Sequence, residues 1–372
     1  MSDRHAATRP LRTASLLPFG LLAAGLLMHA PQPCFAERSD IPAPPLRVMT
    51  FNVLHSSVRS PAGPWSMRRP LVARTIRAAR PDVACLQEVS EIQLADLTRD
   101  LPEYEVVPGA RSGPASFYAL ALVLAASFGT VWLTLMLRGR RSHERRSARR
   151  MPGLVAGAGA LFALVSALTA RYVLGGFLDS GERCPILLLR GRVTAVQLGS
   201  FWFSPHPDRP GSTLPGSPTP HVVHWTRVAD SRTGSTWTIY NTHLGLLPWT
   251  ARATARALFD RLDRDWNGGP QVLAGDLNCA PNGSLMRALL ADRGDRPPGF
   301  HDTWSDAARR EGTAGTFHLG IVADGPRFDY ILVRPSLKVA SARTAFSPRV
   351  RPFPSDHDPL LVELVRGSGA AD

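Results

Sequence analysis

Short runs rich in branched and aromatic residues alternate with helical stretches along most of this 372-residue chain. Short apolar runs bounded by turn-forming residues are typical of strands. The β-rich runs lie at 47–54, 81–89, 185–190, 221–229, 236–243, 270–276, 327–334 and 359–365. Helical patterns cover 67–79 and 250–266, and Ser90 with Gln93 forms a capping box that starts another helix. This alternation predicts an α/β fold.

Two uncharged apolar segments, 115–137 and 151–170, interrupt the alternation. Each is long enough, at ~1.5 Å per residue, to cross a ~30 Å hydrocarbon layer. Seven arginines and one glutamate lie between them at 138–150, and such a basic connector is typical of the cytoplasmic side of a membrane. We therefore expect a transmembrane helical hairpin over 114–178, with a pair of buried helices in a soluble core as the alternative.

The N-terminus has the three parts of a secretory signal. Three arginines precede an apolar stretch at 16–28, and Cys34-Phe35-Ala36 places small residues where a signal peptidase cuts. We expect a signal peptide at 1–36, with an uncleaved signal anchor as the alternative. An exported N-terminus agrees with the hairpin topology, so we expect a bacterial-type cell membrane, with the domain facing the periplasm or the outside.

The formal net charge of +13 would by itself suggest nucleic acid or an anionic membrane as a partner. Much of this charge lies at 138–150, and the remainder is a weak argument for a DNA-binding surface. Hydrophobic residues make up 44% of the chain, which is enough for a substantial core. Four cysteines are too few for a disulfide scaffold of this length.

Polar residues stand at the ends of six β-rich runs, where strands meet loops and α/β proteins commonly place their sites. The six blocks are Thr50–Val53, Cys85–Val89, Asn241–Leu244, Gly275–Asn278, Phe328–Ile331 and Ser355–Asp358. Each block by itself is weak evidence, because a lone buried Asn or His is usually a hydrogen-bonded structural residue.

In this order the six blocks resemble the endonuclease/exonuclease/phosphatase superfamily, which includes pancreatic-type deoxyribonucleases, abasic-site endonucleases, inositol polyphosphate phosphatases and neutral sphingomyelinases. Further matches lie at 181–186, 201–205, 315–318 and 359–364. The resemblance implies a four-layer α-β-β-α sandwich of two mixed β-sheets, here interrupted by the inserted hairpin. It also implies that 37–113 and 179–366 form one catalytic domain, which leaves 367–372 as a flexible tail.

Phosphoester hydrolysis builds negative charge on the phosphoryl and leaving oxygens, and a hard divalent ion with oxygen ligands neutralises that charge. The resemblance implies that Glu88 is the principal Mg²⁺ ligand and that Asn52 assists. Asp356 is expected to contribute directly or through water. We expect Mn²⁺ to substitute for Mg²⁺.

Asp276 and Asn278 are two residues apart, so on an extended segment they point to the same face and reach one phosphate. The resemblance implies that Asp276 orients or deprotonates the attacking water and that Asn278 binds a phosphoryl oxygen. Asp329 is the expected partner of His357, which acts either as a base or as an imidazolium. His243 is the second histidine, expected to stabilise the transition state or to protonate the leaving oxygen.

His318, within the matched block at 315–318, and Arg327, just before the block at 328–331, are candidate substrate contacts, with a surface salt bridge as the alternative for Arg327. His221 has no matching role, so we expect it to be structural or exposed to solvent.

These expectations combine into a Mg²⁺-dependent phosphoesterase, bound to the membrane through 115–137 and 151–170, that hydrolyses a phosphodiester. An anchor next to the site would favour a phospholipid head group of sphingomyelin type. The alternatives are an extracytoplasmic nuclease, a small-molecule phosphatase, and a membrane sensor or scaffold with a non-catalytic domain.

Overall fold

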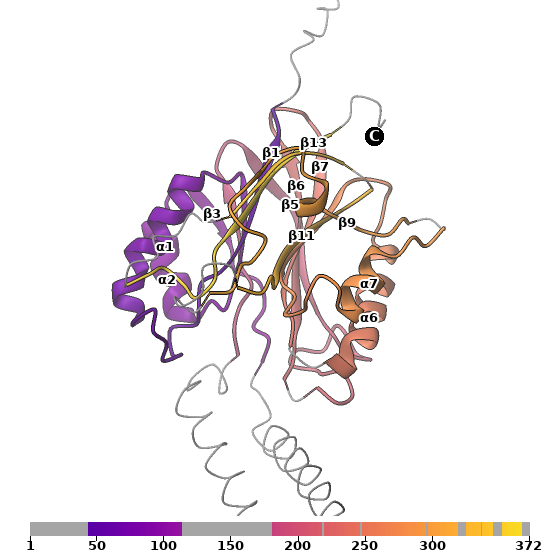
Figure 1. Ribbon diagram of the computed structural model, residues 1–372, viewed down its shortest axis with the longest axis horizontal. Coiled ribbons are helices and arrows are strands. Elements are labelled where there is room, and N and C mark those ends of the chain that lie inside the picture. The colour runs from indigo at the N-terminus through magenta and orange to yellow at the C-terminus, as the bar shows by residue number, and fades with distance from the viewer. Residues whose placement is uncertain are drawn as a thin grey trace, which may run out of the picture. The chain divides into compact units, whose positions relative to one another are not determined.

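The computed structural model describes residues 44–113, 181–217, 219–245, 248–294, 297–318, 325–335, 337–344 and 352–366. The chain divides into two compact units, Met1–Pro42 and Ala43–Asp372, and every described residue belongs to the second. Within this unit, two β-sheets lie between layers of helices (Figure 1).

The first sheet has, in the described part of the chain, seven strands in the order β10-β12-β13-β1-β2-β4-β3. The strands are β1 (Leu46–Asn52), β2 (Val83–Gln87), β3 (Tyr104–Val107), β4 (Ile186–Leu189), β10 (Arg310–Glu311), β12 (Lys338–Arg343) and β13 (Leu360–Val365). β1 pairs parallel with β2 and antiparallel with β13, so the sheet is mixed. All of β2 and all of β1 except Arg47 are buried, which explains why these runs are apolar on both faces.

The second sheet contains six described strands in the order β5-β6-β7-β8-β11-β9. These are β5 (Val193–Trp202), β6 (Val222–Asp230), β7 (Thr236–His243), β8 (Gln271–Asp276), β9 (His301–Asp302) and β11 (Asp329–Arg334). β7 and β8 run parallel, with His243 paired in register with Asp276. β11 runs antiparallel to β8 and places its first residue, Asp329, opposite Asp276. The register of three strands therefore brings three ionisable side chains to one edge.

The two sheets pack face to face through one buried apolar cluster. Val48 and Val83 of the first sheet and Ile239, Val272 and Ile331 of the second are all fully buried in it. Removing a side chain of this size from water contributes about 1.5–3 kcal/mol, so this cluster holds the sheets, and the residues at their ends, in one relative position.

Helices cover the outer faces of both sheets (Figure 1). α1 (Trp65–Ala79) and α2 (Glu91–Asp100) pack on the first sheet, and α6 (Ala251–Arg264) and α7 (Ser284–Leu290) pack on the second. Two short helices complete the described elements, η1 (Pro248–Thr250) and α8 (Thr303–Asp306). The predicted capping box is present at α2, because the Ser90 side chain accepts from Gln93 N–H and the Gln93 side chain accepts from Ser90 N–H. The expected α/β class with two mixed sheets is confirmed.

Five of the described strands were not expected from the sequence, namely β3, β5, β9, β10 and β12. β5 is an edge strand in which most residues from Thr194 to Ser200 are exposed or half-buried, and β3 is the edge strand of the other sheet. Such strands form because their backbones hydrogen-bond to an inner neighbour, so they need no continuous apolar run.

The predicted fold needs one correction, which concerns the expected transmembrane hairpin. Among the described residues, no helix is both long and apolar enough to cross a membrane, and α1, the longest of them, has 15 residues. A membrane span needs about 20 predominantly apolar residues. The fold class is therefore an α/β fold of two mixed sheets, and the hairpin that we expected to interrupt it is not supported.

Several expectations fall on residues outside the described part of the chain. These are the segments 115–137 and 151–170, the basic connector at 138–150, the signal peptide at 1–36 and the tail at 367–372. The domain boundaries and the localisation stay predictions. At the edges of the long gap, Ser112 N–H donates to the Glu182 carbonyl at 2.8 Å, so residues on its two sides are neighbours.

Candidate active site

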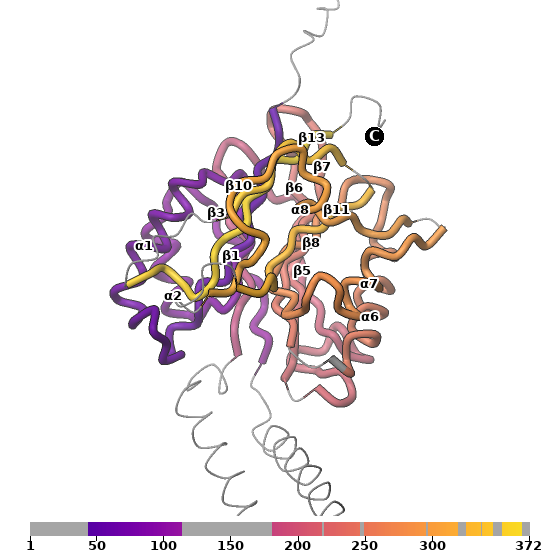
Figure 2. The backbone as a smooth tube through the Cα atoms, viewed as in Figure 1, coloured from indigo at the N-terminus to yellow at the C-terminus, as the bar shows by residue number. Residues whose placement is uncertain are grey.

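Residues from both sheets meet at one edge of the sandwich. Asn52 ends β1 and Glu88 directly follows β2, while His243 and Asp276 end β7 and β8 and Asp329 begins β11. β1 of the first sheet lies against β8 and β11 of the second (Figure 2). The sheet packing thus brings residues that are far apart in the sequence to one place.

A cavity of about 470 Å³ lies at this edge. Its carboxyl and imidazole lining groups are Glu88, Glu182, His221, His243, Asp276, Asp356 and His357. The Asn278 amide also lines the cavity, and Leu54, Phe317 and Phe328 are among its apolar residues. The volume lies within the range typical of sites for small ligands, roughly 300–1,000 Å³.

Asn52 connects the carboxylates of the two sheets. Its side-chain N–H donates to Glu88 Oε1 at 2.9 Å and to Asp276 Oδ2 at 3.1 Å. Glu88 Oε2 accepts from the backbone N–H of His55 at 2.9 Å. Burial opposes ionisation of Glu88, but the charge on His243 and these hydrogen bonds outweigh it, so the pKa of Glu88 lies below its ordinary value.

The carboxylate of Asp276 is held on both oxygens. Oδ2 accepts from Asn52, and Oδ1 accepts from the backbone N–H of Asn278 at 2.9 Å. The preceding Gly275 has φ +149°, and a Cβ there would lie 1.9 Å from the Thr242 carbonyl oxygen, so only glycine fits the turn. Burial, followed by the nearby Asp329, raises the pKa of Asp276 to about 6.

Two histidines flank Asp276 Oδ2, and each is bound to a second carboxylate. His357 Nε2 lies 3.7 Å from Asp276 Oδ2, and its Nδ1 lies 2.7 Å from Asp329 Oδ2. His243 Nε2 lies 3.6 Å from Asp276 Oδ2, and its Nδ1 lies 2.7 Å from Glu182 Oε1. This places a carboxylate between two imidazoles.

Both imidazoles favour the protonated form. Burial lowers the pKa of His357, but Asp329, Asp276 and Asp356 outweigh it and raise the value to about 10. Burial likewise opposes protonation of His243, and Glu182 with Asp276 raises its pKa well above the ordinary value. Each imidazolium can stabilise the negative charge that develops on a reacting phosphate.

The sequence model of the Endonuclease/Exonuclease/phosphatase family matches residues 49–357. The chain belongs to this family. The expected resemblance is confirmed, and the chain is a hydrolase that acts on phosphoester bonds.

Solved structures of this family share the fold at low sequence identity. A family member from Bacteroides vulgatus is 20% identical with a TM-score of 0.64, over 87% of this chain and 99% of that one. The mannosyl-6-phosphatase of Bacteroides thetaiotaomicron is 19% identical with a TM-score of 0.59, over 86% and 99% of the two chains. TDP2 from D. rerio, complexed with a single-stranded DNA product, is 14% identical with a TM-score of 0.53, over 86% and 98%. No curated protein matches the sequence.

Enzymes of this family are typically dependent on a divalent metal, and the site offers suitable ligands. Asp356 is buried, and burial with the negative charge of Glu88 raises its pKa. A divalent cation between Glu88 and Asp356 would remove this repulsion, so the carboxylates fit a hard ion. Ligand atoms of Asp276, Asp329 and His357 also lie within 4.8 Å of one another. However, Asp329 holds the Nδ1 side of His357, which suits an Asp–His pair better than a cage for an oxygen-seeking ion.

Glu182 is a site residue to which sequence reasoning assigned no role. It lies 61 residues before His243 in the chain, and it is buried with its Oε1 against that imidazole. The available signal was the matched block at 181–186, together with the need of a second catalytic histidine for a carboxylate partner.

Arg68 is a second residue to which sequence reasoning assigned no role, and it holds together loops that carry site residues. Its guanidinium is fully buried and donates to four backbone carbonyls, those of Val53, Leu54, Gly63 and Pro354. Burial lowers the pKa of Arg68 to about 10. These bonds connect the loop after Asn52 to the loop before Asp356.

Neither expected substrate contact is among the described lining residues of the 470 Å³ cavity, although their chain neighbours Phe317 and Phe328 are. Arg327 is buried and binds Asp302 through two hydrogen bonds of 2.8 and 2.5 Å, with its guanidinium 4.4 Å from the Tyr330 ring. His318 is buried with Nε2 3.8 Å from Asp358 Oδ1. Their roles in binding substrate stay predictions.

Proposed function

We propose that this chain is a Mg²⁺-dependent phosphoesterase that hydrolyses a compact phosphoester by in-line attack of water. The observation that carries the proposal is the position of Asp276 Oδ2, 3.6 Å from His243 Nε2 and 3.7 Å from His357 Nε2. A carboxylate between two imidazolium groups, beside further carboxylates that fit a cation, is suited to activating water next to a phosphate.

Glu88, Asn52 and Asp356 would hold the ion, with Mn²⁺ as a substitute for Mg²⁺. When bound, the ion neutralises charge on the phosphoryl oxygens. The side-chain oxygen of Asn52, Oδ1, already accepts a hydrogen bond from Leu54 N–H at 3.0 Å. An ion at this site would compete with that bond for the oxygen. The Asn52 amide therefore acts chiefly to hold Glu88 and Asp276 in place.

Asp276 is the proposed base. It accepts a proton from water while the water oxygen forms a bond to phosphorus. With a pKa of about 6 it is mostly ionised at neutral pH, whereas His357, with a pKa of about 10, is protonated and cannot accept a proton. His357 then stabilises the negative phosphoryl oxygens.

His243 is the proposed acid. Its proton passes to the leaving oxygen as the bond between phosphorus and that oxygen breaks, which gives an alcohol and a phosphate. Glu182 holds the opposite side of the imidazole and stabilises its charge. Asn278 Nδ2 lies 2.9 Å from His243 Nε2 and donates to the Leu244 carbonyl, so it can donate to Nε2 only once that nitrogen has given up its proton.

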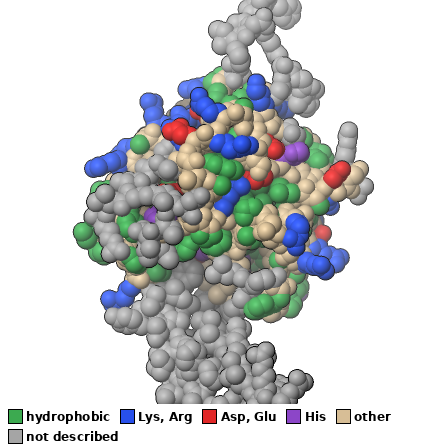
Figure 3. All heavy atoms as spheres, in the orientation of Figure 1, with side chains coloured by type: hydrophobic (Ala, Val, Ile, Leu, Met, Phe, Trp, Pro, Cys, Tyr) green, Lys and Arg blue, Asp and Glu red, His purple; other side chains and the backbone are tan. Residues whose placement is uncertain are grey.

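The proposed substrate is compact because the cavity has a volume of only about 470 Å³. On the face shown in Figure 3, Lys and Arg side chains lie at several separate places, whereas nucleic acids are usually bound along a continuous basic surface. The similarity in fold to a mannosyl-6-phosphatase is in keeping with a small substrate. The argument for a sphingomyelin-type head group depended on the membrane hairpin and loses its support with it.

A substrate panel with Mg²⁺ tests the proposal. We expect the protein to hydrolyse mannose 6-phosphate or bis(4-nitrophenyl) phosphate faster than single-stranded DNA or sphingomyelin vesicles. Asp276→Asn should abolish the activity, while Asp260→Asn on the exposed side of α6 should retain it. Exclusive cleavage of DNA or vesicles would refute the compact substrate, and failure to hydrolyse any of the four would favour a scaffold.

A further inference from the structure

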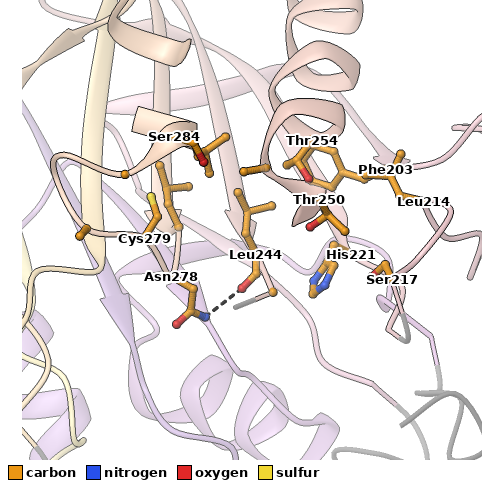
Figure 4. Close-up of a pocket in the computed structure, with 16 residues that line it drawn as sticks. Phe203, Leu214, Ser217, His221, Leu244, Thr250, Thr254, Asn278, Cys279 and Ser284 are labelled. Carbon is orange, nitrogen blue, oxygen red and sulfur yellow. Dashed lines mark hydrogen bonds between the residues drawn. The ribbon is translucent and has the colours of Figure 1, made fainter. Parts of the chain in front are cut away.

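A second cavity adjoins the active-site cavity, under the start of α6 and η1 (Figure 4). It has a volume of about 220 Å³. Apolar side chains of Phe203, Leu214, Leu277 and Leu285 line it. Neither the sequence blocks nor the proposed chemistry gives this cavity a role.

The two cavities share a wall. His221, Leu244, Gly245 and Asn278 line both of them. Asn278 Nδ2 donates to the Leu244 carbonyl at 2.8 Å, as Figure 4 shows, and also lies 2.9 Å from Nε2 of the catalytic His243. A group in the second cavity would therefore lie next to the proposed proton donor for the leaving oxygen.

The second cavity is uncharged. No described lining residue is an aspartate, glutamate, lysine or arginine, and burial lowers the pKa of His221 to about 4, so this imidazole is neutral. His221 is held by contacts of 3.0 Å to Thr219 Oγ1 and 3.1 Å to the His243 carbonyl. Hydroxyl-bearing residues in the lining are Ser217, Thr250, Thr254 and Ser284. An ion would lose its hydration here without gaining a partner, whereas a neutral group would bury apolar surface.

The volume limits the group to about one ring. At roughly 30 Å³ per molecule in the liquid, about seven waters occupy 220 Å³. This is below the roughly 300–1,000 Å³ of sites that hold a complete drug-sized ligand. The cavity thus suits one part of a substrate whose phosphate lies in the adjoining site.

We propose that this second cavity is the subsite for the alcohol part of the substrate, a neutral and mainly apolar group about the size of one ring. The inference rests on the proposed function, because it assumes that a phosphate bonded to this alcohol lies beside His243 and Asp276. The leaving alcohol takes its proton from His243 and remains in the second cavity until it dissociates.

Two esters with matched leaving groups test the subsite. Benzyl and methyl alcohol have nearly equal acidity, so benzyl phosphate and methyl phosphate differ mainly in what they offer to the cavity. We expect kcat/KM to be at least about tenfold higher for the benzyl ester, as for other hydrophobic pockets. If the enzyme requires a phosphodiester, benzyl methyl phosphate and dimethyl phosphate replace the two monoesters in this comparison.

Ala251→Trp fills the cavity from the first residue of α6, which lines it. Ala253→Trp is the matched control, because Ala253 is exposed and lies about 200° further around the helix. We expect Ala251→Trp to remove most of the preference for the benzyl ester and to change methyl ester hydrolysis by less than about twofold. Ser284→Phe fills the cavity from the first residue of α7, which also lines it, and should have the same effect, so a folding defect in one variant would not decide the test.

Binding of benzyl alcohol without metal gives a second readout, by ligand-observed NMR. The wild type and Ala253→Trp should bind it, and Ala251→Trp should not. Equal hydrolysis of both esters by the wild type, or equal losses for both esters in the filled variants, would overturn the subsite and leave the phosphoesterase intact. Binding that Ala251→Trp abolishes, in a protein that hydrolyses no ester, would instead overturn the proposed function.

Discussion

Asp276 and Asp329 lie directly opposite each other across the antiparallel strands β8 and β11. Both are buried, and His357 lies against both, 2.7 Å from Asp329 Oδ2 and 3.7 Å from Asp276 Oδ2. A buried carboxylate beside another is costly to ionise, so the protonated imidazole offsets part of that cost. The buried carboxylates that serve catalysis therefore lower the stability of the folded protein.

Asp276→Asn should abolish hydrolysis and yet stabilise the folded protein in metal-free buffer. The pKa of Asp276 is raised from 3.8 to about 6, so the folded state binds its proton more tightly than the unfolded state does. Ionisation of Asp276 therefore lowers stability as the pH rises from about 4 to above 6. We expect a gain on the order of 2 kcal/mol at pH 7.5 that shrinks toward pH 4, measured by urea unfolding with EDTA present. A variant less stable than the wild type at pH 7.5 would contradict this.

Glu182→Gln should impair catalysis through His243. Without the carboxylate beside Nδ1, the pKa of His243 should fall, because Glu182 is the largest contribution that raises it. We expect kcat to fall by about 10²–10³ with KM changed less than threefold, and the His243 NMR titration to shift to lower pH. Glu105→Gln, at a half-buried position of the edge strand β3, is the control. An unchanged titration of His243 would refute the positioning role.

Mg²⁺ should stabilise the wild type and fail to stabilise Glu88→Gln. At one hundred times the dissociation constant, a ligand specific for the folded state adds about 2.7 kcal/mol. For a chain of this size that is a rise in Tm of several degrees, measurable by calorimetry with Mg²⁺ or EDTA. Equal rises in both proteins would place the ion elsewhere.

Arg68→Met should destabilise the protein by about 3–5 kcal/mol, because it leaves the carbonyls of Val53, Gly63 and Pro354 without their buried donor. Arg74→Met, exposed on the same helix, should change stability by less than about 0.5 kcal/mol. Denaturant unfolding of both variants measures the difference. Comparable stabilities would show that solvent replaces the guanidinium.

The strand-end residues could be found from the sequence because burial and polarity are local patterns. β1, β2 and β8 are buried runs that end in or just before Asn52, Glu88 and Asp276, and this contrast is visible without a structure. The hairpin prediction also used a local pattern, hydropathy, but no packing information, and because no described helix can span a membrane, the lipid substrate has no argument from it.

The hydrogen-bond partner of Arg327 could not be predicted from the local sequence. It is two residues before Asp329, so proximity in sequence suggested a place in the site. β11 begins only at Asp329, and Arg327 pairs with Asp302 of β9. No alternation within one strand could reveal this partner, which comes from a neighbouring strand.

The sequence by itself determined the buried strands and the polar residues that terminate them, since both follow from the spacing of apolar side chains. Only the tertiary structure decided which groups touch. Asn52 and Asp276 are 224 residues apart and meet because the two sheets pack face to face, and Glu182 meets His243 across 61 residues. Such contacts depend on strand order and sheet packing, which are set by the burial of the whole core and not by any one segment.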